Sequence, residues 1–441
     1  MKIEIRNARV IDPASGRDEQ ASVCIADGRI AAVGPVPDGF RADRTIDAKG
    51  LVACPGLVDL SARLREPGFE YRATLESEMQ AAVAGGVTSL ACPPDTDPPL
   101  DEPGLVEMLK RRAESLRQAR VYPLGALTLG LKGQKIAEMG ELTEAGCVAF
   151  FQADAPLTDL NVLLQAMRYA ATFGYPIWLR PQDAHLAHGG VAHEGEVTTR
   201  LGLPPIPAVA ETVALHVILE LAESTGARIH LARLSTAKGV ALVAAAKSRG
   251  LAVTCDVGVH HLHLCDRDAG DFNANMNLVP PLRDPADRDE LRRALAAGTI
   301  DAVCSDHTPV DDDAKQVPFG EAEPGATGLE VLLPLALKWG AEMRLPLPAT
   351  LAAVTSRAAA VLGVEAGTLA PGSAADVCLF DPERHWVVTP AALASQGRNS
   401  PFLGLELVGR VAHTVVGGRV VYSAGGQAPE WGQVPLSRKP Q

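Results

Sequence analysis

The polar residues best placed to do chemistry follow short apolar runs, at the points where buried strands would end. Arginines stand at three such points, as Arg63, Arg180 and Arg233, and the run Ile300–Cys304 leads into Asp306. A guanidinium group has five N–H donors and keeps its charge in proteins, so it binds carboxylates and phosphates. A carboxylate either pairs with such a cation or transfers protons. These residues therefore predict a cationic pocket in which the arginines pair with Asp306.

Alternating strands and helices must position these residues. Apolar runs at Ala149–Phe151, Ile177–Leu179, Ile229–Leu231, Ala252–Cys255 and Ile300–Cys304 alternate with helical patterns at Leu105–Arg120, Asp159–Thr172, Val209–Ser224 and Ala237–Ser248. This alternation predicts an α/β fold with a parallel sheet, most simply a (β/α)₈ TIM-type barrel with its reactive groups at the carboxyl ends of the strands. Both chain ends instead show short alternating strands separated by turns such as Gly417-Gly418. We expect a barrel over residues 56–366 and a small β-sandwich domain formed by residues 1–55 and 367–441, the latter including a tail.

Composition narrows the class of protein. The 441 residues are 47% hydrophobic and carry a formal charge of −12, which argues against nucleic acid or an anionic membrane as a partner. The eight cysteines form no CxxC pair, and the first residues read as a strand and not as a signal peptide. We expect a cytoplasmic protein with reduced cysteines.

The strand-end segments, taken in order, resemble those of the bacterial dihydroorotases of the amidohydrolase superfamily. The resemblance covers almost the whole chain and implies a barrel with one or two zinc ions at its mouth that converts carbamoyl-aspartate to dihydroorotate. It is carried by Val58–Gly68, Cys92–Thr96, Ala149–Asp154, Leu179–Asp183, Ile229–Thr236, Val259–Leu262 and Cys304–Pro309, together with Glu194–Glu196, Pro280–Arg283, Gly328–Glu330 and Asn399–Phe402.

Most positions that hold zinc in that family carry other residue types here. Zinc requires imidazole, thiolate or carboxylate donors, and arginine has no acceptor atom. We therefore expect no metal, no cofactor and no catalytic residue, with Asp306 vestigial. The two positions of the family's His-x-His hold Ser61 and Arg63, the bridging aspartate is replaced by Gln152, the two single histidines by Arg180 and Arg233, and only the last aspartate is retained as Asp306.

The substrate-binding positions implied by the resemblance are mixed, and we take them as vestigial. Arg65 matches the arginine that grips the substrate carboxylate, whereas Asp95 replaces an asparagine and would oppose an anion. An asparagine before two prolines corresponds either to Asn277, with a two-residue insertion, or to Val279. A different metal site in the cluster His260–His263 is the less favoured reading.

Together these observations predict that the chain is not an enzyme. The resemblance includes dihydroorotase-like chains that lack the zinc ligands and accompany aspartate carbamoyltransferase. We therefore expect a noncatalytic structural subunit of an aspartate carbamoyltransferase complex in pyrimidine biosynthesis, a hetero-oligomer that also has homodimer contacts. The expected contact surface is the set of loops Arg65–Tyr71, His185–Glu196 and Val310–Glu323. Two alternatives remain: a pseudoenzyme that binds a regulatory metabolite, and an amidohydrolase that uses Asp306 and an arginine without metal.

Overall fold

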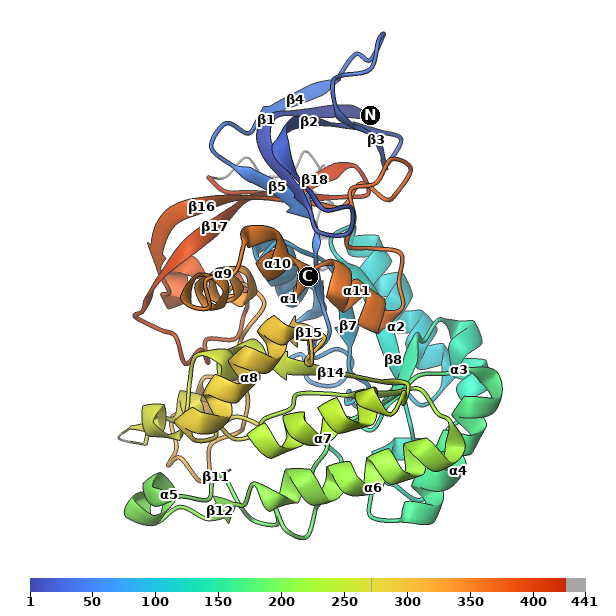
Figure 1. The fold of residues 1–441 in the computed structure, drawn as a ribbon, viewed down its shortest axis with the longest axis vertical. Helices are drawn as coiled ribbons and strands as arrows, with labels where there is room; N and C mark the ends of the chain where they lie inside the picture. Colours follow the sequence, from blue (N-terminus) through green and yellow to red (C-terminus); the bar gives the residue numbers. More distant parts are fainter. Residues whose placement is uncertain (271, 426–441) are drawn as a thin grey trace, which may run out of the picture.

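The computed structural model describes residues 1–270 and 272–425, so the tail expected beyond residue 425 lies outside the described residues. Eight parallel strands form a barrel that occupies the centre of the molecule (Figure 1). In sheet order they are β15 (Ala302–Cys304), β14 (Val253–Gly258), β13 (Ile229–Leu231), β10 (Ile177–Leu179), β9 (Ala149–Phe151), β8 (Arg120–Ala126), β7 (Val87–Cys92) and β6 (Leu57–Asp59). The predicted barrel is confirmed.

Backbone hydrogen bonds bring the first and last strands together just beyond their ends. The amide of His307 donates to the carbonyl of Ser61 at 2.9 Å, and the amide of Arg63 donates to the carbonyl of His307 at 2.9 Å. The barrel is therefore nearly closed at the edge where the polar residues gather.

Helices cover the outside of the barrel, and Figure 1 shows α4, α6, α7 and α8 along it. Three predicted helices are confirmed within one residue at each end, as α4, α6 and α7; side-chain caps begin α4 at Asp159 and α7 at Thr236. The pattern at 105–120 extends too far, because Arg117 adopts a left-handed conformation (φ 54°) that ends α2. The helices are α1 (Leu75–Ala84), α2 (Pro103–Leu116), α3 (Met139–Ala145), α4 (Leu160–Phe173), α5 (Glu196–Leu201), α6 (Val209–Thr225), α7 (Ala237–Ser248), α8 (Pro285–Ala297), α9 (Leu332–Glu342), α10 (Leu347–Ala352) and α11 (Ser356–Leu362).

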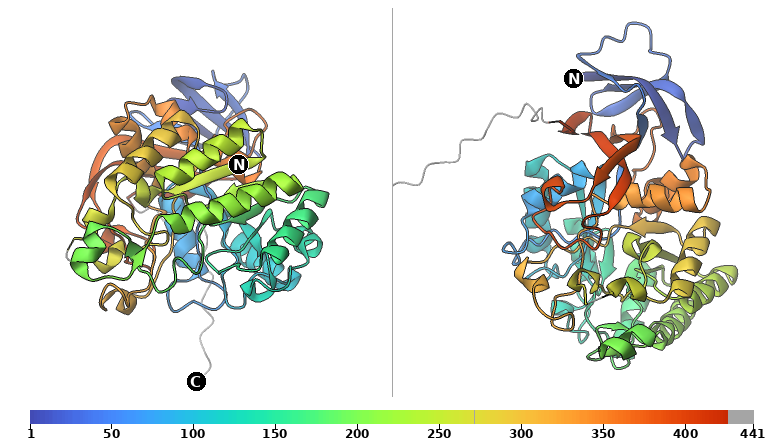
Figure 2. Two further views of the ribbon diagram at one scale, coloured as in Figure 1. Left: turned by 60° about the horizontal axis from the view of Figure 1, so that its bottom comes forward. Right: turned by 90° about the vertical axis from the view of Figure 1, so that its left-hand side faces the viewer.

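Strands from both chain ends share a second sheet at one end of the molecule (Figures 1 and 2). The two halves join where β5 pairs with β16, in a register that places Cys54 opposite Cys378. Its strands are β1 (Lys2–Asp12), β2 (Arg17–Ala26), β3 (Arg29–Gly34), β4 (Arg44–Asp47), β5 (Val52–Pro55), β16 (Val377–Val387), β17 (Glu406–Val416) and β18 (Arg419–Ser423). A separate short pair, β11 (Ala192–His193) and β12 (Pro205–Ile206), lies in the long connection after β10.

The model also bears on membrane insertion. Across residues 1–270 and 272–425, no helix combines the length and the apolar character needed to cross a bilayer.

Candidate active site

The strand ends bring Arg63, Arg180, Arg233, Asp154 and Asp306 together at the mouth of the barrel. They follow β6, β10, β13, β9 and β15 respectively, and the carboxyl ends of parallel strands meet at one edge. The three arginine side chains are almost fully buried, with at most 7% of each exposed. The three arginines and Asp306 therefore meet at the barrel mouth as predicted, but together with Asp154, which the sequence did not assign to the pocket and which offsets part of their charge.

Asp154 is the additional aspartate, and its carboxylate joins all three arginines. Oδ2 accepts from Nη2 of Arg63 at 2.7 Å, while Oδ1 accepts from Nη2 of Arg233 at 2.5 Å and from Nε of Arg180. Burial opposes ionisation, but the charges of Arg233, Arg180 and Arg63 outweigh it and hold the pKa of Asp154 well below its ordinary value. Asp154 is therefore a fixed anion at the centre of the cluster.

Asp306 lies beside Arg233 and Arg63, and its ionised form is less strongly stabilised than that of Asp154. Its Oδ1 accepts from Nη1 of Arg233 at 2.8 Å and lies 3.7 Å from Nη1 of Arg63. Its Oδ2 has no hydrogen-bond partner among the described residues. Burial raises the pKa of Asp306 to about 6, since the opposing charges of Arg233 and Arg63 compensate only in part. Asp306 can thus take up and release a proton near neutral pH.

Asp95 completes the charge balance of the mouth. Its Oδ2 accepts from Nε of Arg63 at 2.7 Å, and Nη1 of Arg63 donates to Oγ1 of Thr308 at 2.9 Å. We call the six residues Arg63, Asp95, Asp154, Arg180, Arg233 and Asp306 the mouth cluster. Its three guanidinium groups and three carboxylates are formally neutral when all are ionised.

Two of the predicted metal-ligand positions do not take part in the mouth cluster. The Gln152 side chain is turned to a neighbouring loop, where it accepts from Oγ1 of Thr128 at 3.0 Å and donates to the carbonyl of Leu131 at 2.9 Å. Ser61 is buried, and its hydroxyl oxygen has no hydrogen-bond partner among the described residues.

One of the predicted substrate-binding residues, Arg65, lies at the mouth, and another, Asn277, has a structural role in a loop. Arg65 is buried at the mouth and donates through Nε to the carbonyl of Pro309 at 2.8 Å; its guanidinium group lies over the ring of Phe69, and its two terminal nitrogens have no hydrogen-bond partner among the described residues. Burial, with the neighbouring charge of Arg63, lowers its pKa to about 10, so it is still a cation at neutral pH. Asn277 instead anchors a loop by donating to the carbonyls of Phe319 and Ala322.

The zinc that the resemblance implies does not fit the mouth cluster. Arg63, Arg180 and Arg233 offer only donors there and would repel a cation. The nearby carboxylates already accept charged hydrogen bonds from these arginines. We derive no chemistry through a metal at this position.

A different group in the described residues has the spacing of metal ligands. His193, Asp284 and Asp287 each place one potential ligand atom within 4.8 Å of the others. Part of this group is already engaged: Asp287 accepts from the amide of Ala237 at 2.7 Å, and Nη1 of Arg283 lies 3.3 Å from Nδ1 of His193. Burial and the charge of Arg283 lower the pKa of His193 to about 4, which leaves a neutral imidazole.

Three other histidines at the strand ends have hydrogen-bond partners, whereas the buried His260 stacks on Phe402 and its ring nitrogens have no such partner among the described residues. His307 faces away from the mouth cluster, with Nε2 2.6 Å from Oε2 of Glu78. Nε2 of His261 lies 3.1 Å from the carbonyl of Pro280, and Nε2 of His263 lies 2.9 Å from the carbonyl of Leu335. The rings of His261 and His263 are thus each held by a contact of their own.

Four residues at the mouth have backbone conformations that residues other than glycine rarely adopt. Positive φ angles occur at Arg65 (64°), Ala153 (52°), Arg233 (59°) and Asp306 (46°). Each costs on the order of 1–3 kcal/mol, and such strain concentrates where a side chain must be aimed for function. The backbone therefore supports this edge as the functional one.

Comparisons with known proteins identify the class of this barrel. A family model described as "Amidohydrolase family" matches residues 191–422, and one described as "Dihydro-orotase-like" matches residues 50–239. The solved structure of an L-hydantoinase (dihydropyrimidinase) from Arthrobacter aurescens superposes with a TM-score of 0.86 at 25% identity, covering 96% of each chain.

Full-length relatives then define the family. A "Dihydroorotase-like protein" of Pseudomonas aeruginosa is 46% identical over 422 residues, which is 96% of this chain and 100% of the relative. A "Dihydroorotase" of Geobacter sp. (strain M21) is 41% identical over 428 residues, with 96% and 100% covered. The chain belongs to the dihydroorotase-like amidohydrolase family.

The prediction that this chain is not an enzyme is wrong by these comparisons. Relatives named dihydroorotase match it over nearly their whole length, and its structural neighbour is a hydantoinase, so both point to a hydrolytic enzyme. The physical error was to equate the loss of zinc ligands with the loss of chemistry. Asp306 has an oxygen without a hydrogen-bond partner in the described part of the chain and a pKa of about 6, a combination suited to proton transfer.

Proposed function

We propose that this chain is a hydrolytic enzyme that opens or closes a cyclic amide bearing a carboxylate, with Asp306 as the catalytic proton-transfer residue. The observation that carries the proposal is the state of Asp306. One of its oxygens is fixed by Arg233, the other is without a partner among the described residues, and its pKa is about 6. A general base works best when its pKa lies close to the working pH.

The chemistry requires one proton to be taken up and returned. In ring opening, water attacks the amide carbon while Asp306 accepts a proton from that water. The ring C–N bond then breaks, and the leaving nitrogen takes the proton from Asp306. The fixed charges of Arg63 and Arg233 favour the negative charge that develops on the carbonyl oxygen. Ring closure is the reverse sequence.

Arg65 is the residue that would bind the substrate carboxylate. Its terminal nitrogens have no hydrogen-bond partner among the described residues. A guanidinium group binds a carboxylate through two parallel hydrogen bonds. Its position at the mouth and the family resemblance support the same role. Asp95 does not oppose an anion as strongly as the sequence suggests, because Arg63 already pairs with it.

The test compares two aspartates of the mouth cluster, with ring opening of dihydroorotate as the assay. D306N removes the proton acceptor, so kcat should fall at least about 100-fold. Wild-type activity should decrease below pH about 6, as Asp306 becomes protonated. The comparison variant is D154N, which removes a carboxylate that stays ionised: an acidic limb should remain, displaced to lower pH because the charge of Asp154 helps to raise the pKa of Asp306. If D306N retains wild-type kcat, Asp306 is not the base and the proposal fails.

We further propose that the chain associates with the catalytic chain of aspartate carbamoyltransferase, in addition to its own chemistry. Carbamoyl-aspartate, the product of that transferase, is the substrate that the resemblance implies. Each of the three mouth loops named above carries a large exposed apolar side chain, at Tyr71 (61%), Leu186 (42%) and Val317 (39%). The buried centre of a protein interface is more apolar than its rim, and tyrosine is enriched in interfaces.

This association is tested by co-expressing the two chains and measuring mass by size exclusion with light scattering. We expect a stable complex with closed symmetry that buries more than about 1,000 Å² at each type of contact. Y71E should weaken it, and V408E, at an exposed residue of β17 outside those loops, is the control. Separate elution of the two chains at micromolar concentration would contradict the proposal.

A further inference from the structure

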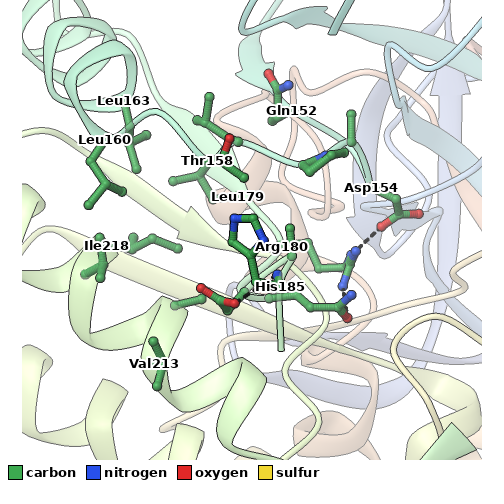
Figure 3. A pocket seen from close by; sticks show the side chains of 18 of the residues that line it. Gln152, Asp154, Thr158, Leu160, Leu163, Leu179, Arg180, His185, Val213 and Ile218 are labelled. Atoms are coloured by element: carbon green, nitrogen blue, oxygen red, sulfur yellow. Dashed lines mark hydrogen bonds and ion pairs between the residues drawn. The ribbon is translucent and has the colours of Figure 1, made fainter. Parts of the chain in front are cut away.

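A cavity of about 210 Å³ lies beside the mouth cluster, between α4, α6 and the ends of β9 and β10 (Figure 3). Arg63, Arg233 and Asp306 do not line it, so it is separate from the proposed proton-transfer site. The apolar side chains that form its walls are Leu157, Leu160, Leu163, Leu179, Val213 and Ile218.

One end of this cavity is polar and positively charged. Arg180 lies there, with Nη1 donating to Oε1 of Gln182 at 2.6 Å and Nε to Asp154. Figure 3 shows Arg180 between Asp154 and the apolar side chains of the cavity. Its remaining terminal nitrogen, Nη2, has no hydrogen-bond partner among the described residues. The cavity therefore ends at a cationic donor that is not saturated.

Two aspartates also line the cavity, and both accept hydrogen bonds. Asp154 is neutralised by the guanidinium groups of the mouth cluster. Asp183 accepts hydrogen bonds from the backbone amides of His185 at 3.0 Å and Leu186 at 2.9 Å. Arg180 is thus the cationic side chain in the lining of the cavity, and its Nη2 is the donor to which an anionic group could bind.

The volume of the cavity and the exposure of its apolar walls indicate the size and character of the remainder of the ligand. An apolar protein cavity of about 150 Å³ can hold benzene, so this cavity accommodates a somewhat larger group. Two of its apolar side chains are unusually exposed, Leu160 at 49% and Val213 at 37%. A bound apolar group would remove part of that surface from water, which favours binding.

We propose that this cavity binds a monocarboxylic acid with an apolar body about the size of one ring, its carboxylate on Arg180 and its body between α4 and α6. The site does not depend on the reaction proposed for Asp306. It gives the chain a second small-molecule site next to the mouth cluster. A ligand bound there would contact Arg180, which bonds to Asp154 of the mouth cluster.

Phenylacetate is a suitable probe, with benzyl alcohol and benzylamine as comparison compounds. By titration calorimetry we expect phenylacetate to bind with a Kd on the order of 1 mM or tighter, as is ordinary for so small a ligand. The alcohol and the amine should bind at least 10-fold more weakly, since neither offers an anion to Arg180. Loss of phenylacetate binding in a cavity-filling variant and loss of kcat in D306N are separate measurements, so this test and that of the proposed reaction can fail independently.

The matched pair of variants lies on one face of α6. V213W fills the cavity and should weaken phenylacetate binding at least 10-fold. V209W, one turn earlier at a residue that is 47% exposed and does not line the cavity, should leave binding unchanged. If V213W does not fold, L160W tests the same wall from α4. Equal affinity for phenylacetate and benzyl alcohol, no binding of phenylacetate at 10 mM, or full binding by the filled variant would overturn the proposal.

Discussion

Replacing Asp306 by asparagine should stabilise the protein at alkaline pH, although it removes an ion pair. Asn keeps the shape of the side chain and mimics the neutral acid. The pKa of Asp306 is about 6 in the folded protein against an ordinary value of 3.8, so folding favours the protonated form. The ion pair with Arg233 therefore does not fully offset the cost of burying the charge.

The size of the effect follows from the two pKa values. At about 1.4 kcal/mol for each pH unit, the difference between 3.8 and about 6 amounts to about 3 kcal/mol. Because the folded pKa is raised, this contribution is fully present below pH about 4 and is lost as the pH rises through about 6. D306N should consequently match the wild type near pH 4 and exceed it by up to about 3 kcal/mol at pH 8.

Thermal unfolding of both proteins across this pH range measures the difference. With an unfolding entropy of about 2 cal/mol/K per residue, 3 kcal/mol corresponds to a Tm difference of about 3 °C for a chain of this length. D154N should show the opposite sign: its folded pKa is lowered, so the aspartate contributes stability above pH about 4 and its loss should lower Tm there. Parallel pH curves for wild type and D306N, or a D306N protein less stable at pH 8, would refute the reasoning.

Three further predictions test other parts of the site. R65M should raise KM for an acidic substrate at least 10-fold with a smaller effect on kcat, because the terminal nitrogens of Arg65 are assigned to the substrate carboxylate; a lowered kcat at unchanged KM in steady-state assays would reassign it. Treatment with a chelator should leave activity unchanged, since the mouth cluster offers no zinc site; if activity is lost, H193N would show whether the group formed with Asp284 and Asp287 holds the metal. G328A should destabilise by about 1–3 kcal/mol, because a Cβ there would lie 2.0 Å from the carbonyl of Ser305, whereas G104A, with open space around it, should not destabilise; chemical denaturation of both checks this.

The sequence was sufficient for five of the eight barrel strands, for the four helices α2, α4, α6 and α7, and for the meeting of distant residues at one barrel edge. Arg63, Arg233 and Asp306 are far apart in the chain, yet each follows an apolar run. The rule that parallel strands present their carboxyl ends together places them in contact. The predicted pairing of Asp306 is present through Arg233 at 2.8 Å, whereas Arg180 pairs with Asp154 instead.

The role of Asp154 could not be read from residue spacing, because it depends on a local backbone turn. Strand β9 ends at Phe151, and Ala153 takes a positive φ of 52°, so the alternation of side chains along a strand no longer applies. Gln152 turns to Thr128 and Asp154 to the arginines. The one signal available from sequence was electrostatic: three buried arginines with one predicted carboxylate partner leave two positive charges uncompensated.

That charge argument also explains why the mouth cluster must be treated as one unit. Arg63 connects Asp95 to Asp154, and Arg233 connects Asp154 to Asp306, so no ion pair in it is independent. A substitution at one member changes the electrostatic environment of the others, and its effects will not add to theirs.

The two aspartates best placed to respond, Asp154 and Asp306, have pKa values shifted in opposite directions under the same arginines. The difference arises because three guanidinium groups bond to Asp154 and only one bonds to Asp306. An unequal sharing of fixed cations thus gives one carboxylate that stays ionised and one that can exchange a proton, which is the division of roles that acid–base chemistry at this edge requires.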